Sequence, residues 1–262
     1  MKNIEGRIVF ITGASSGIGR EMAVQFAAGG AHLGLIARRE DRLRELVEEL
    51  AETGVRMGIA VADVADRGAL ERAVQNLSEA VGFPDIFIAN AGVDGSCSAR
   101  KIDVDRIEGV LRINLLGALY SFGAVLPGMV ERGSGHIVGV SSLAAWRGLP
   151  ISGAYCASKA GLTAMLESFR LDLKGTGVQV TTIHPGFIRT PMTMRPEHAT
   201  DPRKSFPMPF LMDLKPAAKL MIRGIAKGRS EVNPPWQLAT VMRMVRHFPN
   251  WLFDAVFAQR RR

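Results

Sequence analysis

Residues 7–28 read RIVFITGASSGIGREMAVQFAA, and this stretch decides the fold. Arg7 to Thr12 is a short apolar run typical of a buried strand, and the spacing of apolar residues from about Arg20 to Ala28 is typical of a helix. A glycine-rich turn lies between them. Strand, glycine turn and helix in this order are the setting in which backbone N–H groups at a helix N-terminus hold a pyrophosphate. An ordinary glycine turn is the alternative at this point.

The turn itself predicts close contact with phosphate groups. Gly13 permits the turn, while Gly17 and Gly19 remove side chains that would block the phosphates. Three residues separate the first two glycines, which differs from the GxGxxG spacing. The candidate cofactor-binding residues of the turn are Gly13, Ser15, Ser16, Gly17, Ile18 and Gly19.

Strands and helices alternate along the rest of the chain. Apolar strands are expected at 32–37, 57–61, 85–89, 137–140 and 178–183, and charged helices at 40–52 and 67–81. This alternation predicts an α/β fold with a Rossmann-like, doubly wound parallel sheet. Ligands of such sheets lie at the carboxyl ends of the strands, so the polar residues that follow each strand should meet on one rim.

The second strand ends where an acidic residue would bind an adenosine ribose. That position holds Ala37, followed by Arg38 and Arg39. A missing carboxylate beside guanidinium groups suits a ribose 2′-phosphate, so the sequence favours NADP(H) over NAD. Alternatively, the two arginines only open the charged helix that follows.

A second polar segment, SLAAWRGLPISGAYCASK at 142–159, has the pattern of a proton-transfer site. Ser142 follows an apolar strand, and a helix carries Tyr155 and Lys159 four positions apart on one face. A nearby ammonium favours the ionised form of a phenol, whose pKa is ordinarily about 10. Tyr155 is therefore expected to exchange a proton near neutral pH. A surface Tyr and Lys on an ordinary helix would show the same spacing.

Several short motifs follow one another in a specific order: TGASSGIG at 12–19, DV at 63–64, NAG at 90–92, Asn114 within RINLLGAL, SS at 141–142, YCASK at 155–159, and PG with Thr190 at 185–190. Together they resemble the short-chain dehydrogenase/reductase family over about residues 5–195. The resemblance implies the catalytic residues Asn114, Ser142, Tyr155 and Lys159. It also implies cofactor contacts from Arg38, Arg39, Asp63, Val64, Asn90, Ala91, Gly92, Tyr155, Lys159, Pro185, Gly186, Ile188 and Thr190.

The family's mechanism implies a role for each catalytic residue. Ser142 would hydrogen-bond the substrate oxygen, Tyr155 would transfer the proton, and Lys159 would lower the pKa of the tyrosine and bind the nicotinamide ribose. Asn114 would hold a water that links Lys159 to solvent, although a buried asparagine could instead bend or pack its helix. Ser141 competes for the serine role, but adjacent strand-end side chains point opposite ways. The family's usual spacing to Tyr155 selects Ser142.

Length and composition suit a single domain. The chain has 262 residues, 47% of them hydrophobic, enough for one large core. We expect a core over about 5–190, a substrate lid over about 191–215 and an apolar, basic C-terminal tail over about 234–262. The uncharged run 113–130 is expected to be a buried helix, because polar residues, glycines and a proline interrupt it.

The cysteines and histidines indicate the cellular compartment and whether a metal site is expected. The two cysteines, Cys97 and Cys156, cannot form a disulfide framework, which favours a cytoplasmic, reducing compartment. No metal site is expected, because His184 has no second ligand at metal spacing.

The lid and the tail suggest partners. The lid is rich in Pro, Met and Phe, which predicts an adaptable site for a lipophilic small molecule. The tail could lie on an anionic membrane surface, or pack on the lid or on a neighbouring subunit of a homodimer or homotetramer; we favour the packing. A nucleic-acid partner is not expected, because the basic residues are scattered and no binding module is recognisable.

The expected activity is NADP(H)-dependent interconversion of a carbonyl and a secondary alcohol on a lipophilic substrate. Reduction of a 3-oxoacyl thioester is a narrower alternative, and the unusual tail counts against it. From other classes, a non-catalytic NADP(H)-sensing protein on the same fold is contradicted by the intact set of catalytic residues. A membrane-surface scaffold would depend on the tail instead.

Overall fold

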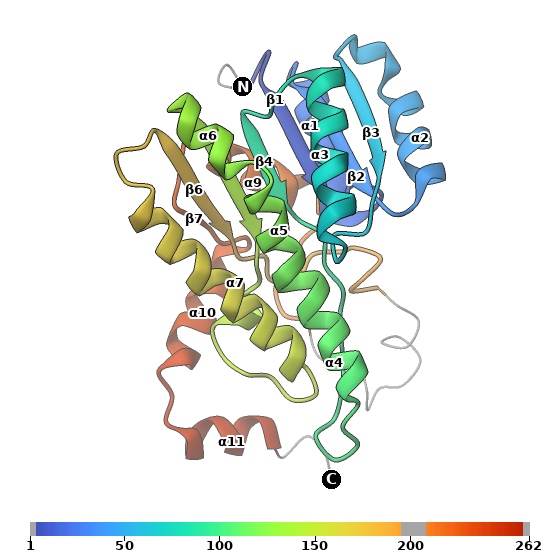
Figure 1. Ribbon diagram of the computed structural model, residues 1–262. Helices are drawn as coiled ribbons and strands as arrows, with labels where there is room; N and C mark the ends of the chain where they lie inside the picture. Colours follow the sequence, from blue (N-terminus) through green and yellow to red (C-terminus); the bar gives the residue numbers. More distant parts are fainter. Residues whose placement is uncertain (1–3, 195–207, 259–262) are drawn as a thin grey trace.

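The computed structural model describes residues 4–194 and 208–258. Figure 1 shows a twisted sheet with helices on both faces. Its seven strands follow the order β3-β2-β1-β4-β5-β6-β7, and every neighbouring pair is parallel. The predicted Rossmann-like, doubly wound sheet is therefore confirmed.

The strands are β1 (Ile8–Thr12), β2 (His32–Ala37), β3 (Met57–Val61), β4 (Ile86–Ala89), β5 (Gly135–Val140), β6 (Val178–Ile183) and β7 (Glu231–Val232). Most are short apolar runs, because a parallel sheet is covered by helices on both faces. The chain moves outward from β1 to β3 and then returns to β4 on the other side of β1. This reversal is the switch point at which doubly wound sheets bind ligands.

The helices are α1 (Gly17–Ala28), α2 (Glu40–Glu49), α3 (Arg67–Val81), α4 (Val104–Leu111), α5 (Gly117–Gly123), α6 (Leu126–Arg132), α7 (Gly153–Asp172), α9 (Leu214–Ala226), α10 (Trp236–Arg246) and α11 (Asn250–Ala258). Neither α9 nor β7 was among the predicted elements. The apolar stripe of α9 carries the helical signal that sequence analysis left unused: Ala217, Ala218, Met221, Ile222 and Ile225.

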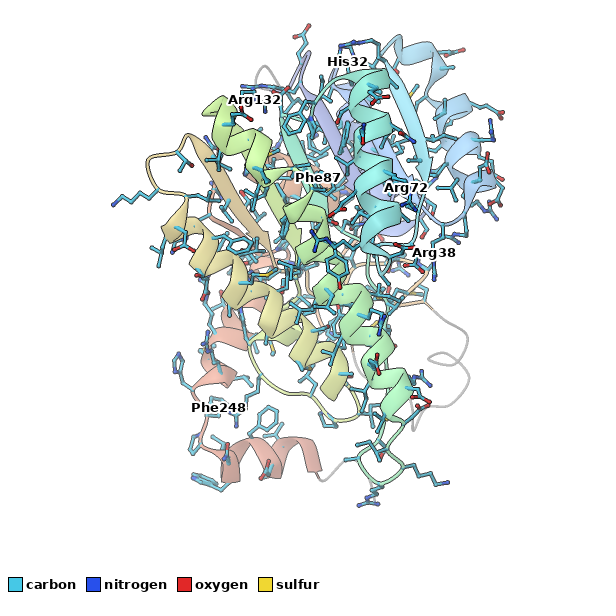
Figure 2. All side chains as sticks on the ribbon, in the orientation of Figure 1. His32, Arg38, Arg72, Phe87, Arg132 and Phe248 are labelled. Atoms are coloured by element: carbon cyan, nitrogen blue, oxygen red, sulfur yellow. The ribbon has the colours of Figure 1, made fainter. Side chains whose placement is uncertain are left out.

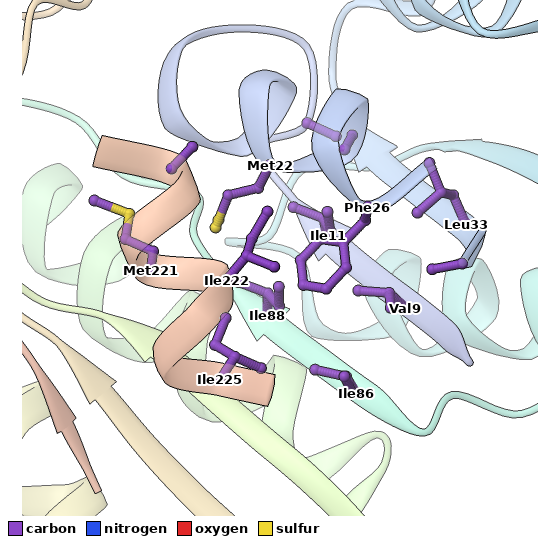
Figure 3. Close-up of a cluster of buried hydrophobic side chains, with 14 of the residues drawn as sticks. Val9, Ile11, Met22, Phe26, Leu33, Ile86, Ile88, Met221, Ile222 and Ile225 are labelled. Atoms are coloured by element: carbon purple, nitrogen blue, oxygen red, sulfur yellow. The ribbon is translucent and has the colours of Figure 1, made fainter. Parts of the chain in front are cut away.

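Helices α1, α2 and α9 cover one face of the sheet. Figure 3 shows Phe26 of α1 and Ile222 of α9 above Ile11 of β1 and Ile88 of β4. All four side chains are fully buried. Burying a side chain of this size stabilises a fold by about 1.5–3 kcal/mol, so this cluster holds α9 beside the cofactor-side helix α1.

Helices α3, α5, α6 and α7 cover the opposite face. Phe122 of α5 and Leu166 of α7 pack there with Phe10 and Phe87 of the sheet, whose ring centroids are 6.3 Å apart. By length and composition alone, the run Val104–Arg132 could cross a membrane. In the fold it is divided among α4, a π-helical turn, α5 and α6. Phe122, Val125 and Met129 of the run join this buried cluster, whereas other apolar side chains such as Leu116 and Leu119 stay exposed.

The carboxyl ends of the strands and the C-terminal tail lie on the same side of the molecule. In Figure 2, Arg38 lies at about mid-height and Phe248 lies lower in the view, whereas His32 and Arg132 lie at the upper end of the sheet. The first part of the expected lid, 191–194, is described as a turn, while its residues 195–207 lie outside the described part of the chain. The tail forms α10 and α11.

Candidate active site

A cavity of about 280 Å³ opens at the carboxyl ends of the strands. Every predicted cofactor-binding residue except Gly19 lines it, as do the predicted catalytic residues Ser142, Tyr155 and Lys159. The cavity also has lining residues that the sequence did not single out: Ala37, Ala62, Val93, Ile113, Val140, Ser141, Pro191, Met192 and Thr193. Most of these adjoin a motif or end a strand, which is the signal that could have found them.

The glycine turn approaches the neighbouring strand end very closely. Gly13 has φ +68°, and a Cβ there would lie 2.8 Å from the Ala91 Cα atom. Gly17 begins α1 with φ +57°. The turn therefore needs both the left-handed conformation and the missing side chain, and it leaves the N-terminus of a 12-residue helix facing the cavity.

Gly19 lies behind the cavity rather than on its wall. A Cβ on Gly19 would instead collide with the Asn90 side chain and would lie 2.6 Å from the Gly13 carbonyl oxygen. The missing side chain lets α1 pack against the turn and the end of β4.

Thr12 and Asn90 join the ends of β1 and β4 at the switch point. The Asn90 Nδ2 atom donates to the Thr12 carbonyl at 2.9 Å. The Thr12 hydroxyl accepts from the backbone N–H groups of Asn90 at 3.0 Å and Ala91 at 3.1 Å. These bonds fix the NAG segment against the glycine turn, a role for Thr12 that sequence analysis missed.

The two arginines after β2 face different partners. Arg39 Nη2 donates to the hydroxyls of Ser15 at 2.9 Å and Ser16 at 2.8 Å, which places its guanidinium over the glycine turn. Arg38 Nη1 lies 3.5 Å from Asp63 Oδ2 at the end of β3. Both arginines are exposed and line the cavity, where a positive charge can meet an anionic ligand.

Tyr155 and Lys159 project from the first turns of α7 into the cavity. Lys159 is 4% exposed, and its Nζ donates to the Val140 carbonyl at 2.8 Å. The same Nζ lies 5.8 Å from the centroid of the Tyr155 ring. Burial lowers the pKa of Lys159 to about 8. The ammonium thus remains mainly protonated at neutral pH.

The pKa of Tyr155 lies above its ordinary value, opposite to the expected direction. Burial raises it to about 12, because a phenolate is poorly solvated inside the protein. A hydrogen bond with Ser142 lowers it, but by less than burial raises it. In this structure Tyr155 is therefore a neutral phenol at neutral pH.

The lowered pKa of Lys159 predicts a rise in stability with pH. An unfolded chain would titrate this lysine near 10.5 and the folded chain near 8, so the unfolded state binds more protons between these values. The free energy of unfolding, measured with urea at about pH 8 and about pH 10, should gain a contribution from Lys159 over this interval. A Lys159→Met variant should lack that contribution; identical pH profiles for the two proteins would contradict it.

The two serines after β5 point to different places, as predicted. Ser141 is buried, and its hydroxyl donates to the Lys159 carbonyl at 2.9 Å and contacts the Thr163 hydroxyl at 2.8 Å. The Ser142 hydroxyl accepts from the Ala144 N–H at 3.1 Å and donates to the Pro185 carbonyl at 3.4 Å, and its proximity to the Tyr155 side chain lowers the pKa of that phenol. Ser141 thus supports α7, while Ser142 shares the cavity with Tyr155.

Asn114 lies behind the cavity wall rather than in it. It sits in the π-helical turn Arg112–Leu116 and is 1% exposed. Its Oδ1 accepts from the Val93 N–H at 2.8 Å, and its Nδ2 donates to the Val93 carbonyl at 3.0 Å and to Ser158 Oγ at 3.1 Å. These contacts make Asn114 a positioning residue that ties the NAG segment to α7. The water-holding role remains a prediction.

His184 is a structural residue at the end of β6. Its Nδ1 bonds to Asn233 Oδ1 at 2.8 Å, and its Nε2 lies 3.2 Å from Thr163 Oγ1. Burial lowers its pKa, so the ring is neutral at neutral pH. Among residues 4–194 and 208–258, no group of three or more His, Cys, Asp or Glu side chains could hold a metal ion.

The cavity fits an elongated dinucleotide. One end carries the glycine turn with Arg38 and Arg39, and the other carries Tyr155 and Lys159. Between them lies Gly92, where a Cβ would meet Asn114 Oδ1 at 3.3 Å and Lys159 Nζ at 3.4 Å. A helix N-terminus and the Tyr155–Lys159 pair thus line one cavity, an arrangement that suits a dinucleotide cofactor.

Comparison with known proteins agrees with this geometry. A sequence model described as short chain dehydrogenase matches residues 7–201. An uncharacterized oxidoreductase of Myxococcus xanthus is 44% identical over 255 residues, which cover 97% of this chain and 98% of that protein. The relative spans the C-terminal tail as well as the core.

Solved structures share the fold. Actinorhodin polyketide ketoreductase with NADPH has a TM-score of 0.80 at 28% identity, covering 87% of this chain and 95% of its own. A short-chain dehydrogenase/reductase from Burkholderia phymatum in complex with NAD has a TM-score of 0.82 at 24% identity, covering 93% and 94%. Both nicotinamide cofactors therefore occur among the structural neighbours. By its sequence match, its fold and its site, this chain belongs to the short-chain dehydrogenase/reductase family of oxidoreductases.

Proposed function

We propose that the protein is an NADP(H)-dependent oxidoreductase that interconverts a carbonyl and a secondary alcohol on a lipophilic small molecule. The observation that carries this proposal is that Ser142, Tyr155 and the buried Lys159 lie together on the wall of the cavity that Arg38 and Arg39 also line. A proton donor and an anion site on one wall are what such a reaction needs.

The residues of the chain divide the proton chemistry among them. A bound nicotinamide cofactor supplies or accepts the hydride. Ser142 would donate a hydrogen bond to the substrate oxygen and stabilise the charge that develops there. In the reducing direction Tyr155 would give its proton to that oxygen, for which the neutral phenol is the required form. The Lys159 ammonium would stabilise the phenolate that remains.

The preference for NADP(H) rests on the arginines after β2. Ala37 stands where a ribose-binding carboxylate would be, and Arg39 lies over Ser15 and Ser16 of the glycine turn. A guanidinium in this place can pair with a 2′-phosphate and has no comparable partner in NAD. The NADPH complex of the ketoreductase neighbour supports the same choice.

Replacing Arg39 or Arg38 with alanine should weaken NADPH binding far more than NADH binding. Each charge-assisted contact to the 2′-phosphate is worth about 1.5–3 kcal/mol, or about 10- to 100-fold in Kd. Fluorescence titration with both cofactors measures the two losses. Arg42→Ala removes an arginine of α2 that pairs with Glu45 at 2.8 Å, and serves as the control. Equal losses for NADPH and NADH would mean that the arginines only open α2.

A lipophilic substrate is supported by the apolar residues of the cavity wall. The wall has several such side chains: Val93, Ile113, Val140, Ile188 and Met192. Apolar walls with a few placed polar groups are typical of sites for lipophilic ligands. The remaining selectivity would come from the lid.

NADPH oxidation across a panel of ketones tests the function. The panel runs from small polar ketones through cyclic and steroid ketones to 3-oxoacyl thioesters. Turnover that rises with apolar surface supports the proposal, while a clear preference for thioesters favours the narrower alternative. NADPH binding without turnover of any ketone would favour the sensing protein instead.

We further propose a cytoplasmic homo-oligomer, with peripheral membrane contact of the tail as the alternative to packing on a neighbouring subunit. Leu116 and Leu119 expose 37% and 39% of their surface beside α4 and α5, and Trp236 and Trp251 of the tail expose 71% and 72%. Light scattering after size exclusion tests the oligomer. Co-sedimentation with anionic vesicles, with and without residues 236–262, tests the membrane contact; equal recovery of both forms would refute it.

A further inference from the structure

The C-terminal tail contacts the segment between Ser142 and Tyr155, which we call the catalytic loop (residues 143–152). Leu238 and Ala239 of α10 pack on Leu143 of the loop, and Trp146 joins the same apolar cluster. Gly186 lies against this cluster, since a Cβ there would meet Leu238 Cδ2 at 2.7 Å. The sequence predicted packing on the lid or on a second subunit; the described contact is with the protein's own catalytic loop.

Trp146 and four other side chains contact one another in a closed circuit. The Arg243 guanidinium lies 5.4 Å from the centroid of the indole, and its Nη2 lies 3.5 Å from Glu231 Oε2. Asn233 Nδ2 donates to the same Glu231 oxygen at 3.3 Å, and Asn233 Oδ1 accepts from His184 Nδ1 at 2.8 Å. The imidazole of His184 closes this circuit of contacts, because its centroid lies 5.3 Å from the centroid of the Trp146 side chain. We call these five residues the Trp146 clamp.

The next residue of the loop is held by α11. Arg147 Nη2 donates to Asn250 Oδ1 at 2.8 Å, and its guanidinium lies 4.5 Å from the centroid of the Phe253 ring. Phe253 is 8% exposed. Two consecutive loop residues therefore contact two consecutive tail helices, each through a cation and an aromatic ring.

The clamp connects to the catalytic residues on both sides. On one side, the Leu143 N–H, directly after Ser142, donates to the Pro185 carbonyl at 3.0 Å, next to His184. On the other, His184 Nε2 lies 3.2 Å from Thr163 Oγ1, which donates to the Lys159 carbonyl at 2.9 Å. A shift of Trp146 would thus reach both Ser142 and α7.

The loop needs such external support. Ile151, four positions before Tyr155, has φ +59°, a left-handed conformation that is strained for a β-branched residue. Its carbonyl accepts from the Cys97 N–H at 2.8 Å, a contact from outside the loop. A strained loop of this kind keeps one conformation only while neighbouring elements hold it.

We propose that the C-terminal helices position the catalytic loop, with Arg243 and Trp146 as the positioning residues that keep Ser142 aligned with Tyr155. The tail is then part of the apparatus for proton transfer, in addition to any surface it offers to a membrane or subunit. The effect on turnover rests on the proposed function, whereas the effect on the loop does not.

Arg243→Ala in the full chain tests the proposal. Hydrogen–deuterium exchange of residues 143–152 should become at least about tenfold faster, because the loop loses one wall of the clamp. The kcat for a turned-over ketone should fall about 10- to 100-fold, since small misalignments at a reacting centre have effects of this size. The Kd for NADPH should change less than about twofold, because Arg243 does not line the cavity. Arg243→Lys keeps the cation beside Trp146, so it should restore part of kcat and part of the loop's protection from exchange.

Arg246→Ala is the matched control, because it removes an exposed arginine from the same last turn of α10. It should leave both exchange and kcat unchanged. Unchanged loop exchange in Arg243→Ala would overturn the proposal, as would faster exchange with undiminished kcat. If the wild-type protein turned over no ketone, faster loop exchange in Arg243→Ala alone would still support positioning, and only the proposed function would fail.

Discussion

Replacing Tyr155 with phenylalanine is expected to lower kcat by at least about 100-fold while NADPH still binds. The substitution keeps the ring in its buried place on α7 and removes only the hydroxyl that carries the proton. Burial raises the pKa of this phenol to about 12, so the neutral acid is the form present at working pH. Ser142 cannot replace it, since a serine hydroxyl is a far weaker acid than a phenol.

The rate of NADPH oxidation measures the expected fall in kcat, and fluorescence titration measures whether NADPH still binds. The chain has two tyrosines, so Tyr120→Phe on α5 is the matched control and should keep full activity. Substantial turnover in Tyr155→Phe would remove this residue from the role of proton donor. Loss of NADPH binding would show that its hydroxyl acts on the cofactor rather than on the substrate.

Replacing Gly13 with alanine is expected to damage both stability and cofactor binding. The left-handed conformation at φ +68° costs about 1–2 kcal/mol for a residue with a Cβ. The new Cβ would also lie 2.8 Å from the Ala91 Cα, and overpacking of this kind costs about 1–3 kcal/mol more. The free energy of unfolding should therefore fall by about 2–5 kcal/mol, and the affinity for NADPH should fall with it.

Gly54 offers a control with the same backbone strain. Its φ is +69°, and a Cβ there meets nothing within 4 Å. The free energy of unfolding of Gly54→Ala should therefore fall only by the cost of the left-handed conformation, about 1–2 kcal/mol. Its NADPH binding should be unchanged. Urea unfolding of both variants gives the comparison. Equal losses would mean that the end of β4 moves aside and that the close approach at Gly13 is not required.

Much of the fold was predictable because its signals are local. Six strands were predicted within two residues of their observed ends, since each is a run of mainly apolar residues: 32–37, 57–61, 85–89, 137–140, 178–183 and the strand ending at Thr12. Strand β7 and helix α9 were missed. The two-residue strand β7 is too short to show a pattern, and α9 follows a segment in which no regular element was expected.

The candidate site was predictable as a set of residues, but less so in the role of each. Gly19 and Asn114 belong to the motifs yet lie behind the cavity, because motif spacing cannot tell a residue that faces a ligand from one that packs behind it. The pKa of Tyr155 moved opposite to the expected direction for a related reason. The charge of Lys159 can be read from the sequence, whereas the burial that raises the pKa of Tyr155 cannot.

By itself the sequence determined the alternation of strands and helices, the phosphate-binding turn and the spacing of Tyr155 and Lys159. Each of these features depends on residues that are close to one another in the sequence. Only the tertiary structure decided that Ser142 and Tyr155 line one cavity, that Arg39 lies over the glycine turn and that Arg243 of the tail lies against Trp146. These contacts join residues far apart in the chain, and they form because the folded sheet brings its strand ends and the C-terminal helices to the same side.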